Sequence, residues 1–154
     1  MRKIIQKLRD LQKRASKHKE DQIDRNLYKL ICDREMLEIA YNNIKSQPGS
    51  MTPGVSPETL DGISIEALEE ISNKLKTEKF QFRTSRRATI PKPSGGSRPI
   101  TVSPPRDKIV QEAMRMILEA IYEPTFSEHS HGFRPKRGCH TALKHVSQKF
   151  QSTV

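Results

Sequence analysis

The chain has 154 residues, a length typical of one domain, and only 33% of them are hydrophobic. Lysine and arginine number 28 against 18 aspartates and glutamates, so the formal net charge is +10. No apolar run approaches the roughly 18 residues of a membrane-spanning helix. The two cysteines lack the paired spacing of a disulfide framework, and the first 20 residues do not form a secretory signal. Such a charge attracts phosphate backbones or anionic lipid head groups, and because no membrane span is expected, nucleic acid is the first partner to test. The alternative is a basic protein without a polyanionic ligand.

Residues 1–20 hold eight basic residues and two acidic ones. Apolar residues recur there at helical spacing, which predicts a basic amphipathic helix: Ile4, Ile5, Leu8 and Leu11. Such a helix could lie on RNA or on a membrane surface, or serve as a mitochondrial transit peptide, although Asp10 argues against the last because transit peptides avoid acids. The fourth alternative is a solvated helix that docks on the protein by one apolar edge. We assign residues 1–26 to a basic N-terminal extension. Its candidate RNA-binding residues are Lys3, Lys7, Lys13, Arg14 and Lys17.

Two helices are predicted in the next part of the chain. The first covers residues 34–45, with Asp33 as its N-cap and one apolar face made of Leu37, Ala40, Tyr41 and Ile44. Two Pro-Gly steps and an Asp-Gly turn then predict a long loop. The second helix begins after Ser64, a good cap, and its expected buried stripe is Ile65, Leu68, Ile71 and Leu75.

Residues 80–103 change character and predict a β-hairpin. Two extended, proline-containing segments flank a turn with Gly95 and Gly96, and the prolines favour edge strands. Several cations surround this turn, so it is suited to closing over a phosphate chain, with Lys92 and Arg98 as the chosen pair. The alternative is a solvated hairpin whose charges only prevent aggregation at its edges.

A helix is expected from about Arg106 to Tyr122, where Pro124 stops it. Its predicted apolar face is Ile109, Val110, Ala113, Met114, Ile117, Leu118 and Ile121. A basic loop follows over residues 127–138, and a last helix starts near His140 with apolar residues Ala142, Leu143, Val146 and Phe150. The spacing of His129, His131, Cys139 and His140 matches no common zinc pattern, so we assign no metal site.

Three sequence blocks, taken in order, carry a specific resemblance. The first is NNIKSQPG (residues 42–49) with TLDG (59–62); the second is RRATIPK (86–92) with RPI (98–100); the third is RDKIVQEA (106–113) with SHGFRPKRGCH (130–140). Together, residues from about 27 to 150 resemble the N-terminal part of group II intron-encoded reverse transcriptase/maturases, especially the organellar kind.

The resemblance implies an α+β fold, mostly helical with a β-hairpin. Residues 27–154 would form the fingers and the start of the palm of a right-hand reverse transcriptase. It also implies that Lys92 and Arg98 meet the phosphates of the incoming nucleotide, and that Gly132, Phe133 and Arg134 lie near the template strand. The candidate RNA- and template-binding residues are Arg83, Arg86, Arg87, Gly132, Phe133, Arg134, Lys136 and Arg137.

In that family, the catalytic aspartates are expected beyond the last residue of this sequence, so we assign no catalytic residue and expect no polymerase activity from these residues alone. Magnesium belongs to the complete family enzyme, and we expect no cofactor for this chain alone. The expected role is binding of a group II intron or another structured RNA, in RNA splicing, within the mitochondrial matrix. Alternatives are a split half completed by a separate palm-thumb chain, an inactive remnant, or a component of an organellar ribonucleoprotein such as the mitochondrial ribosome.

Overall fold

The computed structural model describes residues 2–17 and 26–150; residue 1, residues 18–25 of the predicted extension and residues 151–154 lie outside the described residues. It confirms the predicted α+β class, with helices and a two-stranded antiparallel sheet. The elements, in chain order, are α1 (Arg2–Lys17), α2 (Leu27–Ile31), α3 (Arg34–Ile44), α4 (Ile65–Lys76), β1 (Arg86–Pro91), β2 (Ser97–Val102), α5 (Pro105–Tyr122), the 3-10 turn η1 (Glu123–Thr125) and α6 (Cys139–Phe150).

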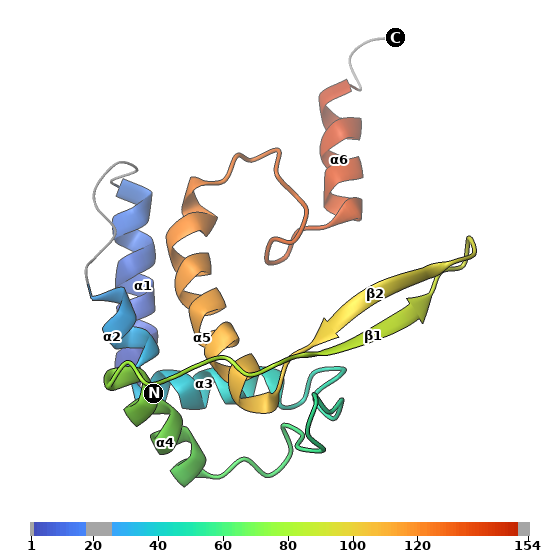
Figure 1. Ribbon diagram of the computed structural model, residues 1–154. Coiled ribbons are helices and arrows are strands. Elements are labelled where there is room, and N and C mark those ends of the chain that lie inside the picture. Colours follow the sequence, from blue (N-terminus) through green and yellow to red (C-terminus); the bar gives the residue numbers. More distant parts are fainter. Residues whose placement is uncertain (1, 18–25, 151–154) are drawn as a thin grey trace.

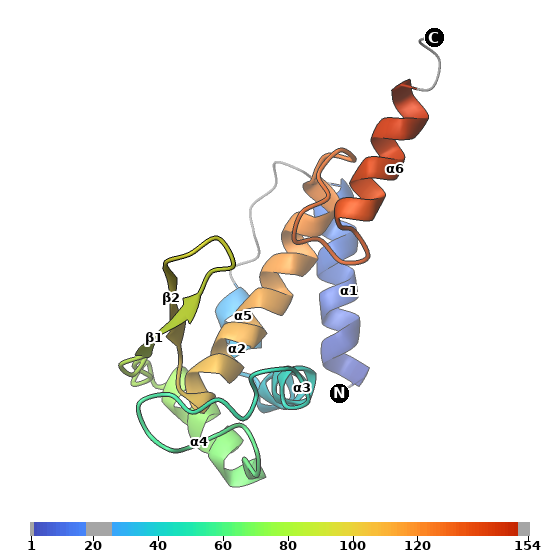
Figure 2. The ribbon, with the colours of Figure 1, turned by 90° about the vertical axis from the view of Figure 1, so that its right-hand side faces the viewer.

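The helix α5 is the centre of the core. Both α1 and α3 lie against it, and α4 packs against α3 and α2 (Figures 1 and 2). Its buried apolar residues recur every three or four positions: Ile109, Val110, Ala113, Ile117 and Ile121. The neighbouring helices contribute Ile4, Leu11, Met36, Leu37, Ala40, Leu68, Ile71 and Leu75. Burying each large apolar side chain contributes about 1.5–3 kcal/mol, so this single cluster carries most of the stability.

Both predicted helix caps are confirmed. The Asp33 carboxylate accepts the backbone N–H of Glu35 at 2.9 Å, and the Ser64 hydroxyl accepts that of Ala67 at 3.2 Å. These bonds satisfy amide groups that the first helical turn leaves without a partner. The short helix α2 was not predicted, because five residues are too few to show a periodic pattern.

The predicted hairpin is confirmed and forms an arm that extends away from the helices (Figure 1). The pairing runs from Arg86 opposite Val102 to Pro91 opposite Ser97. Gly95 and Gly96 both have positive φ, at 85° and 79°, a conformation that disfavours other residues. Most of the arm is exposed, but Ala88 and Ile100 are half-buried and Val102, at its base, is buried.

Two predicted apolar faces are only partly buried. Ile65 is 55% exposed, and on α5 Met114 and Leu118 are 39% and 47% exposed, because these positions turn away from the core. The large apolar residues of α6, Leu143, Val146 and Phe150, are exposed, and no described residue of that helix is buried. The helix α1 docks by one apolar edge, through Ile4 and Leu11.

Asp107 joins the arm to the helical core. Its side chain is 1% exposed, yet it lies in the first turn of α5 and accepts the backbone N–H of Arg83 at 2.8 Å. The other carboxylate oxygen lies 3.4 Å from Nε of Arg106, whose guanidinium lies over the ring of Phe80. The segment leading into β1 is therefore held at the N-terminus of α5.

We predict that Asp107→Ala lowers the free energy of unfolding by about 1–3 kcal/mol, because the Arg83 amide then loses its acceptor. Urea unfolding measures the change, with Asp61→Ala as the exposed control, expected within about 0.5 kcal/mol of wild type. Asp107→Asn keeps an acceptor oxygen and should cost less than the alanine variant. Equal stability of Asp107→Ala and wild type would contradict the role.

Candidate nucleic-acid interface

The arm exposes four of the predicted contact residues. Arg86 and Arg87 lie at the base of β1, and the guanidinium of Arg86 donates to the carbonyl of Pro53 at 3.2 Å. Lys92 is one residue beyond the last strand pair, Pro91–Ser97, and Arg98 is one residue inside it. The turn is closed by the Lys92 N–H donating to the carbonyl of Gly96 at 3.1 Å. The fold thus brings Lys92 and Arg98 to the same end of the arm.

The cations that lead into the arm are held by the fold. Arg83 lies 3.8 Å from Glu58 in an exposed ion pair, and its backbone is bonded to Asp107. Arg106, which was not among the predicted site residues, donates to the carbonyl of Gln81 at 3.1 Å. A guanidinium stacked on an aromatic ring and bonded to a backbone carbonyl is a structural anchor.

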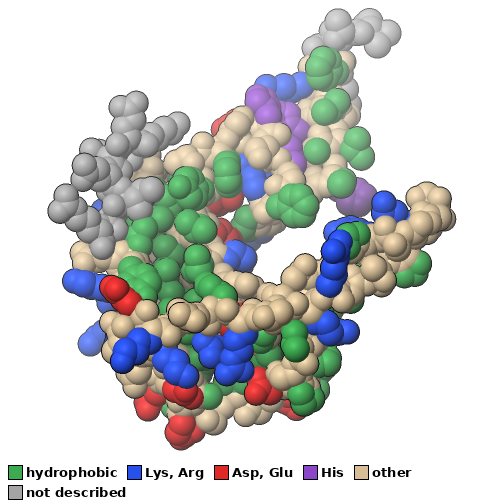
Figure 3. Space-filling view, viewed as in Figure 1, with side chains coloured by type: hydrophobic (Ala, Val, Ile, Leu, Met, Phe, Trp, Pro, Cys, Tyr) green, Lys and Arg blue, Asp and Glu red, His purple; other side chains and the backbone are tan. Residues whose placement is uncertain are grey.

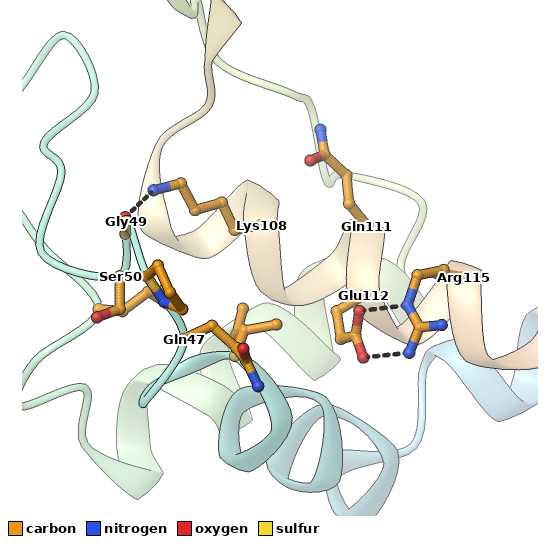
Figure 4. A pocket seen from close by; sticks show the side chains of 10 residues that line it. Gln47, Gly49, Ser50, Lys108, Gln111, Glu112 and Arg115 are labelled. Carbon is orange, nitrogen blue, oxygen red and sulfur yellow. Dashed lines mark hydrogen bonds and ion pairs between the residues drawn. The ribbon is translucent and has the colours of Figure 1, made fainter. Parts of the chain in front are cut away.

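A cavity of about 440 Å³ with both polar and apolar lining residues lies between α5 and the Pro-Gly loop that follows α3 (Figure 4). The ammonium of Lys108 donates to the carbonyls of Gly49 and Thr52 and so ties this loop to α5; burial lowers the pKa of Lys108. Gln47, Ser50 and Gln111 line the same cavity. Sequence reasoning missed this site, although blocks 42–49 and 106–113 supply most of its residues.

The wall of this cavity is an ion-pair network. Glu112 accepts from Arg115 through both oxygens, at 2.7 and 2.8 Å, and from Asn43 at 3.2 Å; Arg115 also bonds to Glu119. Burial opposes the charged form of Glu112, but these hydrogen bonds hold its pKa below the ordinary value. The fold therefore uses Arg115 internally, and its charge is largely neutralised.

The loop after η1 contains a buried arginine that holds its shape and exposed residues that face solvent. Arg134 has only 7% of its side chain exposed and is bonded to the Glu123 carboxylate and to the carbonyls of Ser127 and Ser130. Phe133, beside it, is fully exposed with φ of 57°, and Lys136 has φ of 60°. Arg137 donates through Nη1 to the carbonyl of Glu128 at 2.6 Å. Arg134 thus shapes the loop that presents Gly132, Phe133 and Lys136.

The predicted basic residues of α1 are exposed: Lys3, Lys7, Lys13, Arg14 and Lys17. They lie across the helical body from the arm, as both ribbon views show (Figures 1 and 2). The candidate cations therefore form separate patches, and the structure does not gather them into one site.

An apolar hollow of about 700 Å³ lies beside α5. Its lining includes Met114, Leu118, Tyr122, Phe126 and Phe133. The space-filling view shows the molecule hollowed between the arm and the part of the chain that carries α6 (Figure 3). In the described ranges, no helix is long and apolar enough to cross a membrane. Among the same residues, no group of three or more histidines, cysteines or carboxylates is arranged to hold a metal ion.

No model of a known protein family matches the chain. The chain is 52% identical over 149 residues to the "Uncharacterized 91 kDa protein in cob intron" of Schizosaccharomyces pombe, covering 96% of this chain and 18% of that protein. It is 40% identical over 141 residues to the "Group II intron-encoded protein LtrA" of Lactococcus lactis subsp. cremoris, covering 89% of this chain and 24% of that protein. A shorter match, 50% over 48 residues, is to "Nuclear intron maturase 2, mitochondrial" of Arabidopsis thaliana, covering 31% of this chain and 6% of that protein.

The chain thus spans less than a quarter of the length of these relatives. The identity nevertheless extends through all three blocks on which the resemblance was recognised, since the first match covers 96% of the chain. The chain belongs to the family of group II intron-encoded proteins.

Proposed function

We propose that this chain is an RNA-binding fingers unit of a group II intron-encoded reverse transcriptase/maturase and acts in binding or splicing of intron RNA. The observation that carries the proposal is the exposed basic arm, anchored at its base to α5 through Asp107. An arm that is anchored at its base and carries cations at its exposed end can contact a phosphate chain.

Within this proposal the cations have different tasks. Lys92 and Arg98 contact RNA phosphates and, when a palm is present, the phosphates of an incoming nucleotide. Arg86, Arg87, Lys136 and Arg137 contact the RNA backbone, and Phe133 offers a ring on which an unpaired base can stack. Arg83 and Arg134 hold the segments that present these groups. The exposed lysines and arginine of α1 would engage a separate part of the RNA.

The family relationship also supports a place of action. One relative carries the word mitochondrial in its name, and another is named for the cob intron. We therefore propose that the chain acts in the mitochondrion, on an RNA of the intron type.

A second candidate is a half of a polymerase that is completed by a separate palm-thumb chain. The apolar hollow beside α5 favours it, because exposed aromatic and aliphatic side chains that are clustered mark protein-binding surfaces. The third reading, a component of an organellar ribonucleoprotein, would use the same basic arm. Co-purification with a protein chain, an intron RNA or a ribosome distinguishes the three.

We predict that the purified chain binds single-stranded RNA with a strong salt dependence. About four to eight neutralised phosphates correspond to a slope of log K against log salt of roughly −3 to −6, at about 0.7 per phosphate. Filter binding at several salt concentrations measures the slope. A slope near zero would show that the charge is not a nucleic-acid surface.

Lys92→Ala and Arg98→Ala should each reduce the magnitude of the slope of log K against log salt by about 0.7, because each variant loses one phosphate contact. Arg98→Lys should recover little, since a planar guanidinium fork differs from a point charge. Lys74→Ala is the matched control, because its ammonium is already bonded to Glu70. Unchanged slopes in both arm variants would remove the arm from the interface.

The polypeptide of these 154 residues should extend no primer on an RNA template with Mg²⁺ or Mn²⁺. Two-metal polymerisation needs carboxylates that converge on the ions, whereas Glu112, Glu119 and Glu123 are bonded to arginines. Primer extension by the pure protein tests this, with an active reverse transcriptase as the positive control. Measurable cDNA would refute the expectation.

A further inference from the structure

Three histidines gather where the loop after η1 meets α6. His129 and His131 come from the loop and His145 from the helix; the ring centroids of His129 and His131 lie 4.9 and 5.5 Å from that of His145. We call His129, His131 and His145 the histidine cluster. Residues 16 positions apart in the sequence thus meet through tertiary structure, and none of the three was assigned a role from sequence.

The cluster is held in place by its surroundings. The Nδ1 atom of His131 lies 2.9 Å from the hydroxyl of Thr141, which also accepts the backbone N–H of Gly138. Arg137 and Arg134 both donate to the carbonyl of Ser130, the residue between His129 and His131. The loop therefore presents its imidazoles in a set geometry beside the start of α6.

The charged side chains near His131 are basic. From the loop, Arg134, Arg137 and His129 face His131, and from α6, His145 does. Residues 129–154 contain no aspartate or glutamate, and Glu123 is paired with Arg134. Burial and then these cations lower the pKa of His131, so the loop disfavours a second positive charge on that ring until an anion binds beside it.

Such a site fits an anion better than a cation. A divalent metal would meet two nearby guanidiniums, and the described residues contain no group arranged as metal ligands. A phosphate instead gains hydrogen bonds from protonated imidazoles, which then donate through both ring nitrogens. The aromatic Phe133 lies exposed on the same loop, which is compatible with a strand of RNA passing over it.

We propose that the histidine cluster is a binding site for a backbone phosphate of RNA, which takes up protons as the phosphate binds. This inference rests on the proposed RNA-binding function and adds to it a site and a pH dependence. A bound phosphate raises the histidine pKa values above those of the unliganded protein. Affinity therefore rises as pH falls through the pKa values of the complex, and the gain is complete below those of the unliganded protein.

The first test follows the histidine ring signals of the chain by NMR across pH 5–8, alone, with oligouridylate, and with inorganic phosphate at the same phosphate concentration. Oligouridylate should raise the pKa values of His129, His131 and His145 and leave that of His140, exposed in the first turn of α6, nearly unchanged. A rise with oligouridylate alone supports an RNA backbone site, and a rise with both ligands supports a general phosphate site. Unchanged pKa values in the cluster with both ligands overturn the proposal.

The second test compares RNA affinity at pH 7.5 and 5.5 in wild type, His145→Gln and His140→Gln, with circular dichroism as a check on folding. A rise of one unit in one histidine pKa corresponds to about a tenfold gain at the lower pH. Wild type and His140→Gln should both show this gain, and His145→Gln should lose most of it. If His145→Gln gains as much RNA affinity at pH 5.5 as wild type does, the phosphate site is refuted but the proposed function stands. If wild type shows no salt-dependent RNA binding at either pH, the proposed function itself is refuted.

Discussion

The burial of one face of α5 is the constraint on which the rest of the structure depends. With a hydrophobic content of 33%, the chain has apolar side chains for one core, and α5 supplies five of its buried residues. Neighbouring positions on the same helix reach in other directions: Asp107 holds the arm and Lys108 holds the Pro-Gly loop. A shift of α5 would therefore displace both the arm and the loop that borders the cavity.

This arrangement divides the cations into two groups with different physical roles. Arg106, Arg115 and Arg134 are bonded to backbone carbonyls or to carboxylates, and their side chains stabilise the fold. Lys92 and Arg98 stand exposed at the end of the arm, where a phosphate can reach them without breaking an internal bond. The net charge of +10 overstates the binding surface, because ion pairs such as those of Arg115 and Arg134 neutralise part of it.

Local signals were read correctly from the sequence, and tertiary ones were not. The caps Asp33 and Ser64 and the paired glycines of the turn act through bonds or torsions within a few residues, so the pattern predicts them. Met114 and Leu118 lie at helical spacing from core residues but are exposed, because the width of an apolar stripe does not say how much of it is covered. The histidine cluster depends on the contact between α6 and the loop that precedes it, and the spacing of the histidines in the sequence does not predict this contact.

The exposed apolar surface beside α5 and on α6 lies near the histidine cluster. Met114 and Leu118 of α5, Phe126 and Phe133 of the loop, and the exposed apolar residues of α6 lie on the part of the chain that also carries the histidine cluster. Exposed apolar area of this kind is stabilised when a second surface covers it. A protein that covered the exposed apolar residues of α6 together with the hollow would add contacts to a helix in which no described residue is buried. Because His145 and Thr141 belong to α6, such a partner would also fix the cluster, and protein binding and phosphate binding would reinforce each other through that one helix.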